Sequence, residues 1–327
     1  MLKVENLSTS YRTIDGDVRV LNRVNFQINE NEIFGIAGES GCGKTTLLKV
    51  LYDIIDFPLQ VDEGRVVLSV KKNGGTVDFE TGRIRNAWWK HISYVPQAAQ
   101  SVLNPITRLK TQFLDSIPEE YRKNETKQQT LDRVAHYLEE LSLSPDILEA
   151  YPFQLSGGMR QRAIIALATF MSPSVVLADE PTTALDVVVQ RGILMMLMRL
   201  QRKLKNTLVL VSHDIGVHYQ ITHRMGIMYS GSLVELGKTA DLFREPLHPY
   251  TKLLIEALPR IGDKRPRTGI PGRPPALTNP PDGCRFAPRC PYATEMCRKH
   301  VPEFREAQPG RFVACHLVQE EASENVR

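Results

Sequence analysis

One eight-residue segment constrains the fold of this chain more than any other feature. Residues 38–45 read GESGCGKT, which matches the pattern G-x-x-x-x-G-K-[ST]. The segment follows IFGIAG, a run typical of a buried strand, and opens KTTLLKVLYDII, a helix-like stretch. A glycine-rich turn between a strand and a helix presents backbone N–H groups to phosphates, and the positive N-terminus of the helix strengthens that attraction. The pattern therefore predicts a nucleoside-triphosphate site.

Several residues of this loop have expected roles. Lys44 is expected to reach the β- and γ-phosphates, and the hydroxyl of Thr45 is expected to bind Mg²⁺. Cys42 also belongs to the expected nucleotide site, at a small-residue position that it fills as serine would. The remaining residues expected to line the nucleotide are Gly38, Ser40, Gly41, Gly43 and Thr46.

A second apolar run carries the acids that such a site needs. SVVLADEP reads as a buried strand that ends in Asp179 and Glu180. Asp179 is expected to hold the hydration shell of Mg²⁺, and Glu180 to orient and polarise the attacking water as a general base. The two acids are a weak signal alone, but they become specific in a chain that also has a phosphate-binding loop.

A third segment reads LSGGMRQR at 155–162. Ser156 is expected to cap a helix, and Gly157 and Gly158 to leave backbone donors free for a phosphate. By itself, an ordinary helix start would explain the segment better. Its position shortly before the acidic strand favours the phosphate interpretation.

Composition excludes several classes of protein. Hydrophobic residues make up 42% of the 327 residues and charged residues 24%, which excludes a disordered or collagen-like chain. No apolar run approaches the roughly 18 residues of a membrane-spanning helix, and the N-terminus shows none of the features expected of a signal peptide. The net charge of +4 is smaller than a nucleic-acid-binding protein usually carries, so we expect no nucleic-acid partner.

The chain changes character near its C-terminus. Residues 261–282 contain six prolines and three glycines, which predicts an extended connector. Four of the five cysteines follow it with the spacing C-x₅-C-x₆-C-x₁₇-C: Cys284, Cys290, Cys297 and Cys315. Four basic residues lie beside them in the sequence: Arg285, Arg289, Arg298 and Lys299. These basic residues are expected either to compensate a negatively charged centre or to form a solvated face.

The motifs occur in the order and spacing of a known family. β-Branched runs alternate with helical patterns over the first ~260 residues, which predicts an α/β core with a mostly parallel sheet. The phosphate-binding loop, LSGGMRQR, LADEPTTALD and SHD together resemble the ATP-binding subunit of an ABC transporter over about residues 1–245. The resemblance implies an ABC-type P-loop ATPase core with an antiparallel β subdomain and a helical subdomain inserted at about 98–168. Residues 246–327 would form a C-terminal extension that contains the cysteines.

Individual residues take further expected roles from this resemblance. Tyr11 matches the aromatic residue that stacks on adenine, and Gln97 matches the residue that contacts Mg²⁺ and the transmembrane partner. Asp186 matches the D-loop, and His213 the histidine that contacts the γ-phosphate. The family implies a sandwich dimer, in which the signature serine, Ser156, closes on the ATP held by the partner's loop.

A narrower resemblance extends over nearly the whole chain. SVLNP, YPFQLSGGMRQR, PLHPYT and PPDGCRFAPRCPYATEMC are similar to segments of peptide-importer ATPases, and IPGRPPAL leans toward their D-type subunit. This resemblance implies import of dipeptides or oligopeptides from the cytoplasmic face of the membrane. The implied partners are a second similar ATPase, two permease subunits and an extracytoplasmic solute-binding protein. An oligosaccharide or nickel importer is the alternative within the class, and a soluble ABC ATPase not linked to transport is the alternative outside it.

The narrower resemblance also implies a [4Fe–4S] cluster on the four cysteines. Disulfides are not expected in a cytosolic protein, and the tight C-x₂₋₄-C pairs of structural zinc sites are absent. Four thiolates can hold an iron–sulfur cluster, while zinc and plain buried thiols stay open from the residues alone. We expect the cluster to be structural, with redox sensing as an open addition. Its loss is expected to leave the chemistry of Lys44 and Glu180 intact.

Overall fold

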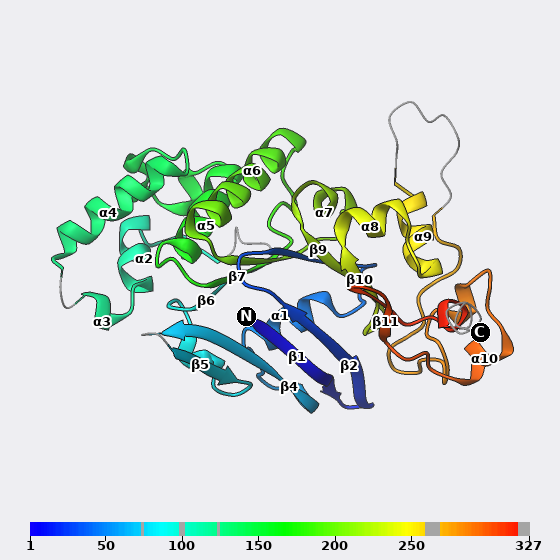
Figure 1. Cartoon of the computed structure of the whole chain (residues 1–327). Coiled ribbons are helices and arrows are strands. Elements are labelled where there is room, and N and C mark those ends of the chain that lie inside the picture. Colours follow the sequence, from blue (N-terminus) through cyan, green and yellow to red (C-terminus); the bar gives the residue numbers. More distant parts are fainter. Residues whose placement is uncertain (73–74, 98–101, 123–124, 259–268, 320–327) are drawn as a thin grey trace.

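The computed structural model contains two β-sheets with helices packed around them (Figure 1). The structure describes residues 1–72, 75–97, 102–122, 125–258 and 269–319. Residues 98–101, where the helical insertion and SVLNP are expected to begin, lie outside the described residues, as does the first part of the proline-rich connector, 261–268.

The smaller sheet is antiparallel, with the strand order β2-β1-β4-β5 within the described residues. Its strands are β1 (Leu2–Thr13), β2 (Gly16–Ile28), β4 (Leu59–Lys72) and β5 (Gly75–Glu80). This sheet confirms the expected antiparallel β subdomain.

The larger sheet has the strand order β11-β12-β10-β9-β3-β8-β7-β6 within the described residues. Its strands are β3 (Ile33–Ala37), β6 (Ile92–Val95), β7 (Val175–Asp179), β8 (Thr207–Val211), β9 (Arg224–Tyr229), β10 (Ser232–Lys238), β11 (Arg305–Gln308) and β12 (Arg311–Val313). Strands β6, β7, β8, β3 and β9 are parallel. Every residue of β3, β7 and β8 is buried, as continuous apolar runs in a covered parallel sheet require.

Helices and short 3₁₀ turns fill the connections. The helices are α1 (Lys44–Leu51), α2 (Leu109–Ser116), α3 (Glu119–Arg122), α4 (Lys127–Glu140), α5 (Gly157–Thr169), α6 (Val187–Leu204), α7 (Ile215–Ile221), α8 (Thr239–Arg244), α9 (Pro249–Glu256) and α10 (Glu295–Lys299). The 3₁₀ turns are η1 (Ile84–Ala87), η3 (Pro145–Glu149), η4 (Pro152–Gln154) and η5 (Ala287–Arg289). None of the helices in the described part of the chain has the length and apolarity needed to span a bilayer.

Helix α1 carries the phosphate-binding loop into the centre of the molecule, because its apolar side chains lie between the two sheets. Leu47 and Leu48 belong to one buried cluster with Leu2 of the smaller sheet and Val209 of the larger one. The helix ends at Leu51, earlier than the helix-like stretch KTTLLKVLYDII indicates.

The early end of α1 has a local cause. Asp53 adopts a left-handed conformation, with φ of 64°. Its carboxylate accepts hydrogen bonds from the backbone N–H groups of Gly82 and Arg85. The chain therefore turns to join the antiparallel subdomain.

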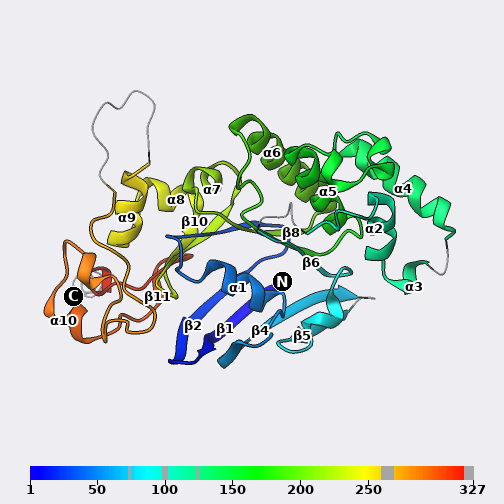
Figure 2. The ribbon, with the colours of Figure 1, turned by 180° about the vertical axis from the view of Figure 1, so that it is seen from behind.

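Two regions lie at opposite ends of the molecule in both views (Figures 1 and 2). Helices α2–α5 form the helical end, where a second apolar cluster packs α2, α4 and α5 against α6 and the parallel strands. The C-terminal region, residues 246–258 and 269–319, forms the other end. The boundaries drawn at 98–168 and 246–327 from the sequence stay predictions.

The C-terminal region is part of the main sheet. Strand β12 pairs with β10, with Glu235 opposite Val313. Phe286 is fully buried. The centroid of its ring lies 5.1 Å from that of Tyr229 and 5.3 Å from that of Tyr250. The segment expected to be a tail beyond a connector therefore shares sheet and apolar core with the nucleotide-binding part of the chain.

Candidate nucleotide site

The phosphate-binding loop has a conformation that only glycine tolerates at its first position. Gly38 has φ of 152°, and a Cβ there would lie 2.2 Å from the carbonyl oxygen of Met228. Lys44 is buried, and its Nζ donates to the carbonyl oxygens of Gly38 (2.8 Å) and Glu39 (3.0 Å). The loop therefore curls around the ammonium group that is expected to meet phosphate.

The other loop residues divide between an open side and a buried side. Ser40 and Gly41 are exposed, while Gly43 and Thr46 are buried. Cys42 is buried in the apolar cluster around α1, and burial raises the pKa of its thiol. This environment fits the prediction that Cys42 acts as a filler.

Asp179 and Thr45 lie together at the end of β7, where the Mg²⁺ site is expected. The Thr45 hydroxyl donates to Asp179 Oδ1 at 3.3 Å, and Tyr94 donates to Asp179 Oδ2 at 3.1 Å. Asp179 is fully buried, and this burial raises its pKa, while the two hydrogen bonds act in the opposite direction. A hydroxyl and a carboxylate are hard oxygen donors of the type that Mg²⁺ prefers.

Glu180 and His213 form a second pair beside this site. His213 Nδ1 lies 3.0 Å from Glu180 Oε2, and the Thr183 hydroxyl donates to the same oxygen at 2.7 Å. Glu180 has φ of 47°, an unusual value for a residue other than glycine. Its side chain is 13% exposed and that of His213 58%. The predicted general base and the predicted γ-phosphate contact are thus neighbours, although they are 33 positions apart in the chain.

The two outlying residues of the expected site differ in placement. The Tyr11 hydroxyl lies 3.4 Å from Thr46 Oγ1, which puts this aromatic ring beside the start of α1. Gln97 is exposed just after β6 and is the last described residue before 98–101. The structure therefore brings Tyr11 to the loop, and the contact between Gln97 and Mg²⁺ stays a prediction.

The signature segment forms the helix start that the sequence predicts. Ser156 caps α5 and accepts a hydrogen bond from the backbone N–H of Met159 at 3.3 Å. Asp186 caps α6 in the same way, with hydrogen bonds from Val188 and Val189. Within the described residues, no hydrogen bond or ion pair connects Ser156, Gly157 or Gly158 to the phosphate-binding loop.

The four C-terminal cysteines converge on one small cavity. Cys284, Cys290, Cys297 and Cys315 line it together with His248 and Phe286. Burial raises the pKa of Cys284 to about 11 and also raises the pKa values of Cys290 and Cys315. In the described part of the chain, no three His, Cys, Asp or Glu residues are grouped so as to hold a metal ion. The iron–sulfur prediction is therefore not supported beyond the convergence of the thiols.

The basic residues beside these cysteines do not form one solvated face. Arg298 and Lys299 are exposed, but Arg289 is buried and forms an ion pair with Glu39 of the phosphate-binding loop. Arg285 donates to the carbonyl oxygen of Ser230.

Sequence reasoning missed three residues that support the site: Tyr94, Tyr250 and Arg289. Tyr250 lies in PLHPYT, and its hydroxyl accepts a hydrogen bond from the backbone N–H of Glu39 at 3.0 Å. The motif PLHPYT indicates that Tyr250 matters, but it does not show that Tyr250 contacts Glu39.

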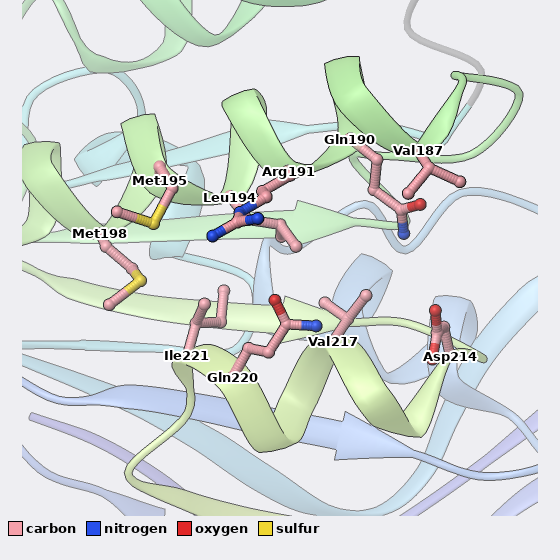
Figure 3. Close-up of a pocket in the computed structure, with 10 residues that line it drawn as sticks. All are labelled: Val187, Gln190, Arg191, Leu194, Met195, Met198, Asp214, Val217, Gln220 and Ile221. Carbon is pink, nitrogen blue, oxygen red and sulfur yellow. The ribbon is translucent and has the colours of Figure 1, made fainter. Parts of the chain in front are cut away.

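A groove between α6 and α7 lies outside the predicted nucleotide site (Figure 3). Met195 and Met198 of α6 and Val217 of α7 contribute apolar side chains to it, and Asp214 lies at one end. It contains none of the residues assigned to ATP.

The chain matches two family models. The model described as "ABC transporter" matches residues 21–183, and that described as "Oligopeptide/dipeptide transporter, C-terminal region" matches residues 234–297. The second match includes three of the four C-terminal cysteines.

Individual proteins agree with these matches. The dipeptide transport ATP-binding protein DppD of Caldanaerobacter subterraneus is 37% identical over 322 residues, which cover 98% of each chain. The oligopeptide transport ATP-binding protein OppD of Salmonella typhimurium is 35% identical over 98% of this chain and 95% of its own length. Among solved structures, the dimeric ABC transporter cassette MJ0796 has a TM-score of 0.61 and 26% identity, over 73% of this chain and 99% of that cassette.

Proposed function

Because this chain belongs to the ATP-binding subunits of dipeptide and oligopeptide ABC transporters, we propose that it hydrolyses ATP to power peptide import. The observation that carries the proposal is the meeting of the phosphate-binding loop with Asp179, Glu180 and His213 at one edge of the parallel sheet. These residues come from three separate motifs, and an ATPase needs all of them in one place.

The geometry supports a hydrolytic role for Glu180 and His213. Glu180 would accept a proton from the attacking water, and its carboxylate is held for this by Thr183 and His213. His213 is the more exposed partner and would contact the γ-phosphate from the open side. Lys44, already positioned by two carbonyl oxygens, would stabilise charge on the β- and γ-phosphates.

Mg²⁺ would be held by Thr45 and Asp179, with Gln97 as a further ligand, and would neutralise phosphate charge when bound. The direct contact between the Thr45 hydroxyl and Asp179 supports this assignment, because it shows that the two oxygen donors are within reach of each other.

Complete sites require a second ATPase chain. Ser156, Gly157 and Gly158 have no contact with the chain's own phosphate-binding loop among the described hydrogen bonds and ion pairs, which fits a signature that serves the partner's ATP. We propose a heterodimer with a similar ATPase, attached peripherally to the membrane through two permease subunits. A solute-binding protein would deliver the peptide.

The test is peptide uptake into proteoliposomes that contain the full complex of ATPases, permeases and solute-binding protein. We expect uptake of a labelled dipeptide or oligopeptide to require ATP and to stop with Lys44→Ala. If ATPase activity is independent of peptide and the complex takes up nickel or an oligosaccharide, the assigned cargo would change to that class. Activity that depends on nucleic acid and not on the permeases would contradict the proposal.

We further propose that the four C-terminal thiols hold a [4Fe–4S] cluster. Their convergence on one cavity from sequence positions up to 31 residues apart is the supporting observation. Four cysteine thiolates are the usual ligand set of such a cluster. Protein purified without oxygen should contain about four irons and four acid-labile sulfides per chain. Stoichiometric zinc, or four metal-free thiols, would contradict this assignment and leave the ATPase proposal untouched.

A further inference from the structure

An ion pair joins the C-terminal region to the phosphate-binding loop. Arg289 Nη1 lies 2.7 Å from Glu39 Oε2, and Arg289 Nη2 lies 3.0 Å from Glu39 Oε1. This is the bidentate geometry in which arginine binds carboxylates most strongly. The Arg289 side chain is 4% exposed and that of Glu39 25%, so the contact is largely shielded from water.

The guanidinium group of Arg289 is fixed on every side. Besides its two bonds to Glu39, it donates to the carbonyl oxygens of Pro271 (2.8 Å) and Ile270 (3.2 Å) and to the Tyr229 hydroxyl (3.2 Å). These contacts use the five N–H donors that an arginine has. Lysine could not reproduce them, because its ammonium group has three donors and no planar fork.

Glu39 belongs to the phosphate-binding loop, and its backbone forms two further hydrogen bonds. Its carbonyl oxygen accepts the ammonium group of Lys44, and its backbone N–H donates to the hydroxyl of Tyr250. Its carboxylate is therefore a negative charge in the loop that is expected to bind the negatively charged phosphates of ATP. Arg289 compensates that charge, and its hydrogen bonds to Glu39 raise the pKa of the guanidinium group.

A second set of hydrogen bonds also links the C-terminal region to the phosphate-binding loop. Arg285 donates to the carbonyl oxygen of Ser230, and the next residue, Gly231, donates its N–H to the carbonyl oxygen of Cys42 at 2.9 Å. Arg285 and Arg289 directly follow and precede cysteines of the C-terminal cavity, Cys284 and Cys290. Two short chains of contacts, one through Arg289 and one through Arg285, therefore connect the cysteine-lined cavity to the phosphate-binding loop.

We propose that Arg289 is a positioning residue of the ATP site, which holds Glu39 and neutralises its carboxylate so that the loop can accept phosphates. This inference rests on the proposed ATPase function. It makes the C-terminal region a part of the nucleotide site, and it revises the expectation that disturbing the cysteines leaves the chemistry of Lys44 intact.

The test is the equilibrium affinity for Mg·ATP of the full chain, compared among four variants. Arg289→Ala should bind roughly tenfold more weakly, the order of effect of one uncompensated charge near the phosphates at an effective dielectric constant of about 20. Glu39→Gln alone should bind at least as tightly as wild type, because it removes the repulsive charge and leaves the positive charge of Arg289. The double variant Glu39→Gln/Arg289→Ala, which carries neither charge, should recover to within about threefold of wild type. Lys299→Ala, which loses only an exposed ion pair with Glu295, should match wild type.

The rescue distinguishes charge compensation from a general packing role, since a packing defect at residue 289 would persist in the double variant. Thermal unfolding without nucleotide checks that each variant is folded. If Arg289→Ala does not fold, Arg289→Gln replaces it, with the same expected loss and rescue. Wild-type affinity in the Arg289 variant, or a loss that Glu39→Gln does not restore, would overturn the inference. Failure of wild-type protein to bind Mg·ATP at all would instead contradict the proposed function.

Discussion

The phosphate-binding loop is contacted by two regions that differ in how they are encoded. The acidic edge consists of Asp179, Glu180 and His213, which lie at or just after the ends of two neighbouring parallel strands. The C-terminal region contacts the same loop through Tyr250 and Arg289, from a helix start and a 3₁₀ turn. In our proposal, the first region would supply the reacting groups, and the second would support the loop's conformation and charge.

In this proposal, a region without reactive groups is still part of the catalytic site. The acidic edge should affect the rate of hydrolysis, whereas the C-terminal region should affect stability and ATP affinity. Substitutions in the two regions should therefore have separable effects.

The largest effect is expected at the acidic edge. Glu180→Gln should bind ATP but hydrolyse it about 10²–10⁴-fold more slowly, because the general base is lost. The measurement is steady-state ATPase activity in the assembled transporter, with nucleotide binding measured in parallel. Glu139→Gln, an exposed acid on α4, is the matched control and should be fully active. Wild-type turnover in the Glu180 variant would remove this residue from the assigned role.

The next largest effect is expected in the C-terminal region. Phe286→Ala should lower the free energy of unfolding by about 3–5 kcal/mol, since it leaves a cavity beside Tyr229 and Tyr250. Urea denaturation measures this loss. Phe153→Ala, at an exposed ring, should change stability by less than about 0.5 kcal/mol. A similarly small effect for both variants would show that the C-terminal region is only loosely attached.

Two buried histidines, His218 on α7 and His248 in the C-terminal region, should make the protein sensitive to acid. Burial lowers the pKa of His218 to about 4 and that of His248 to about 3. The unfolded chain therefore takes up protons first, and stability is lost as the pH falls below about 6.5. Each histidine should cost about 2 kcal/mol between pH 7.5 and pH 5.

Substitution separates the two histidines. His248 caps α9 by accepting the N–H of Tyr250, and asparagine can serve as such a cap. We therefore expect urea denaturation of His248→Asn to show about half of the acid-induced loss that these two histidines cause together. An unchanged slope in His248→Asn would mean that this histidine is not held neutral in the folded state.

The smallest effect is expected from a single hydroxyl. Tyr250→Phe removes the acceptor for the Glu39 N–H while keeping the ring. The net loss of one hydrogen bond should destabilise the binding-competent loop by about 0.5–1.5 kcal/mol. If all of this free energy is lost from ATP binding, the affinity should fall a few-fold. Calorimetric titration with Mg·ATP measures it. Tyr292→Phe, at an exposed ring of the same region, is the control.

These contacts also show what could be predicted from the sequence. Lys44, Asp179 and Glu180 were predictable because phosphate chemistry requires certain residue types at fixed positions after a strand or before a helix. The role of His213 came only from the resemblance, and the parallel pairing of β7 and β8 explains why this residue lies beside Glu180. The antiparallel sheet likewise came from the resemblance.

The contact of Arg289 with Glu39 could not be predicted, because the two residues are 250 positions apart. In the sequence, Arg289 is one of four basic residues beside cysteines, and nothing local distinguishes it from the exposed Arg298. The proline-rich composition predicted a separate tail, but strand pairing of β12 with β10 and burial of Phe286 attach this region to the core. Packing between residues so far apart in the chain produces no periodic pattern of apolar residues in the sequence.

The most direct test of the account is hydrogen exchange of the Glu180→Gln chain with and without Mg·ATP. Binding couples regions reciprocally, so a C-terminal region that supports the loop should itself be stabilised when ATP binds. We predict slower exchange both in residues 38–45 and in residues 284–291, with no change in the exposed surface of α4. Slower exchange in residues 38–45 alone would contradict the claim that the C-terminal region is part of the nucleotide site.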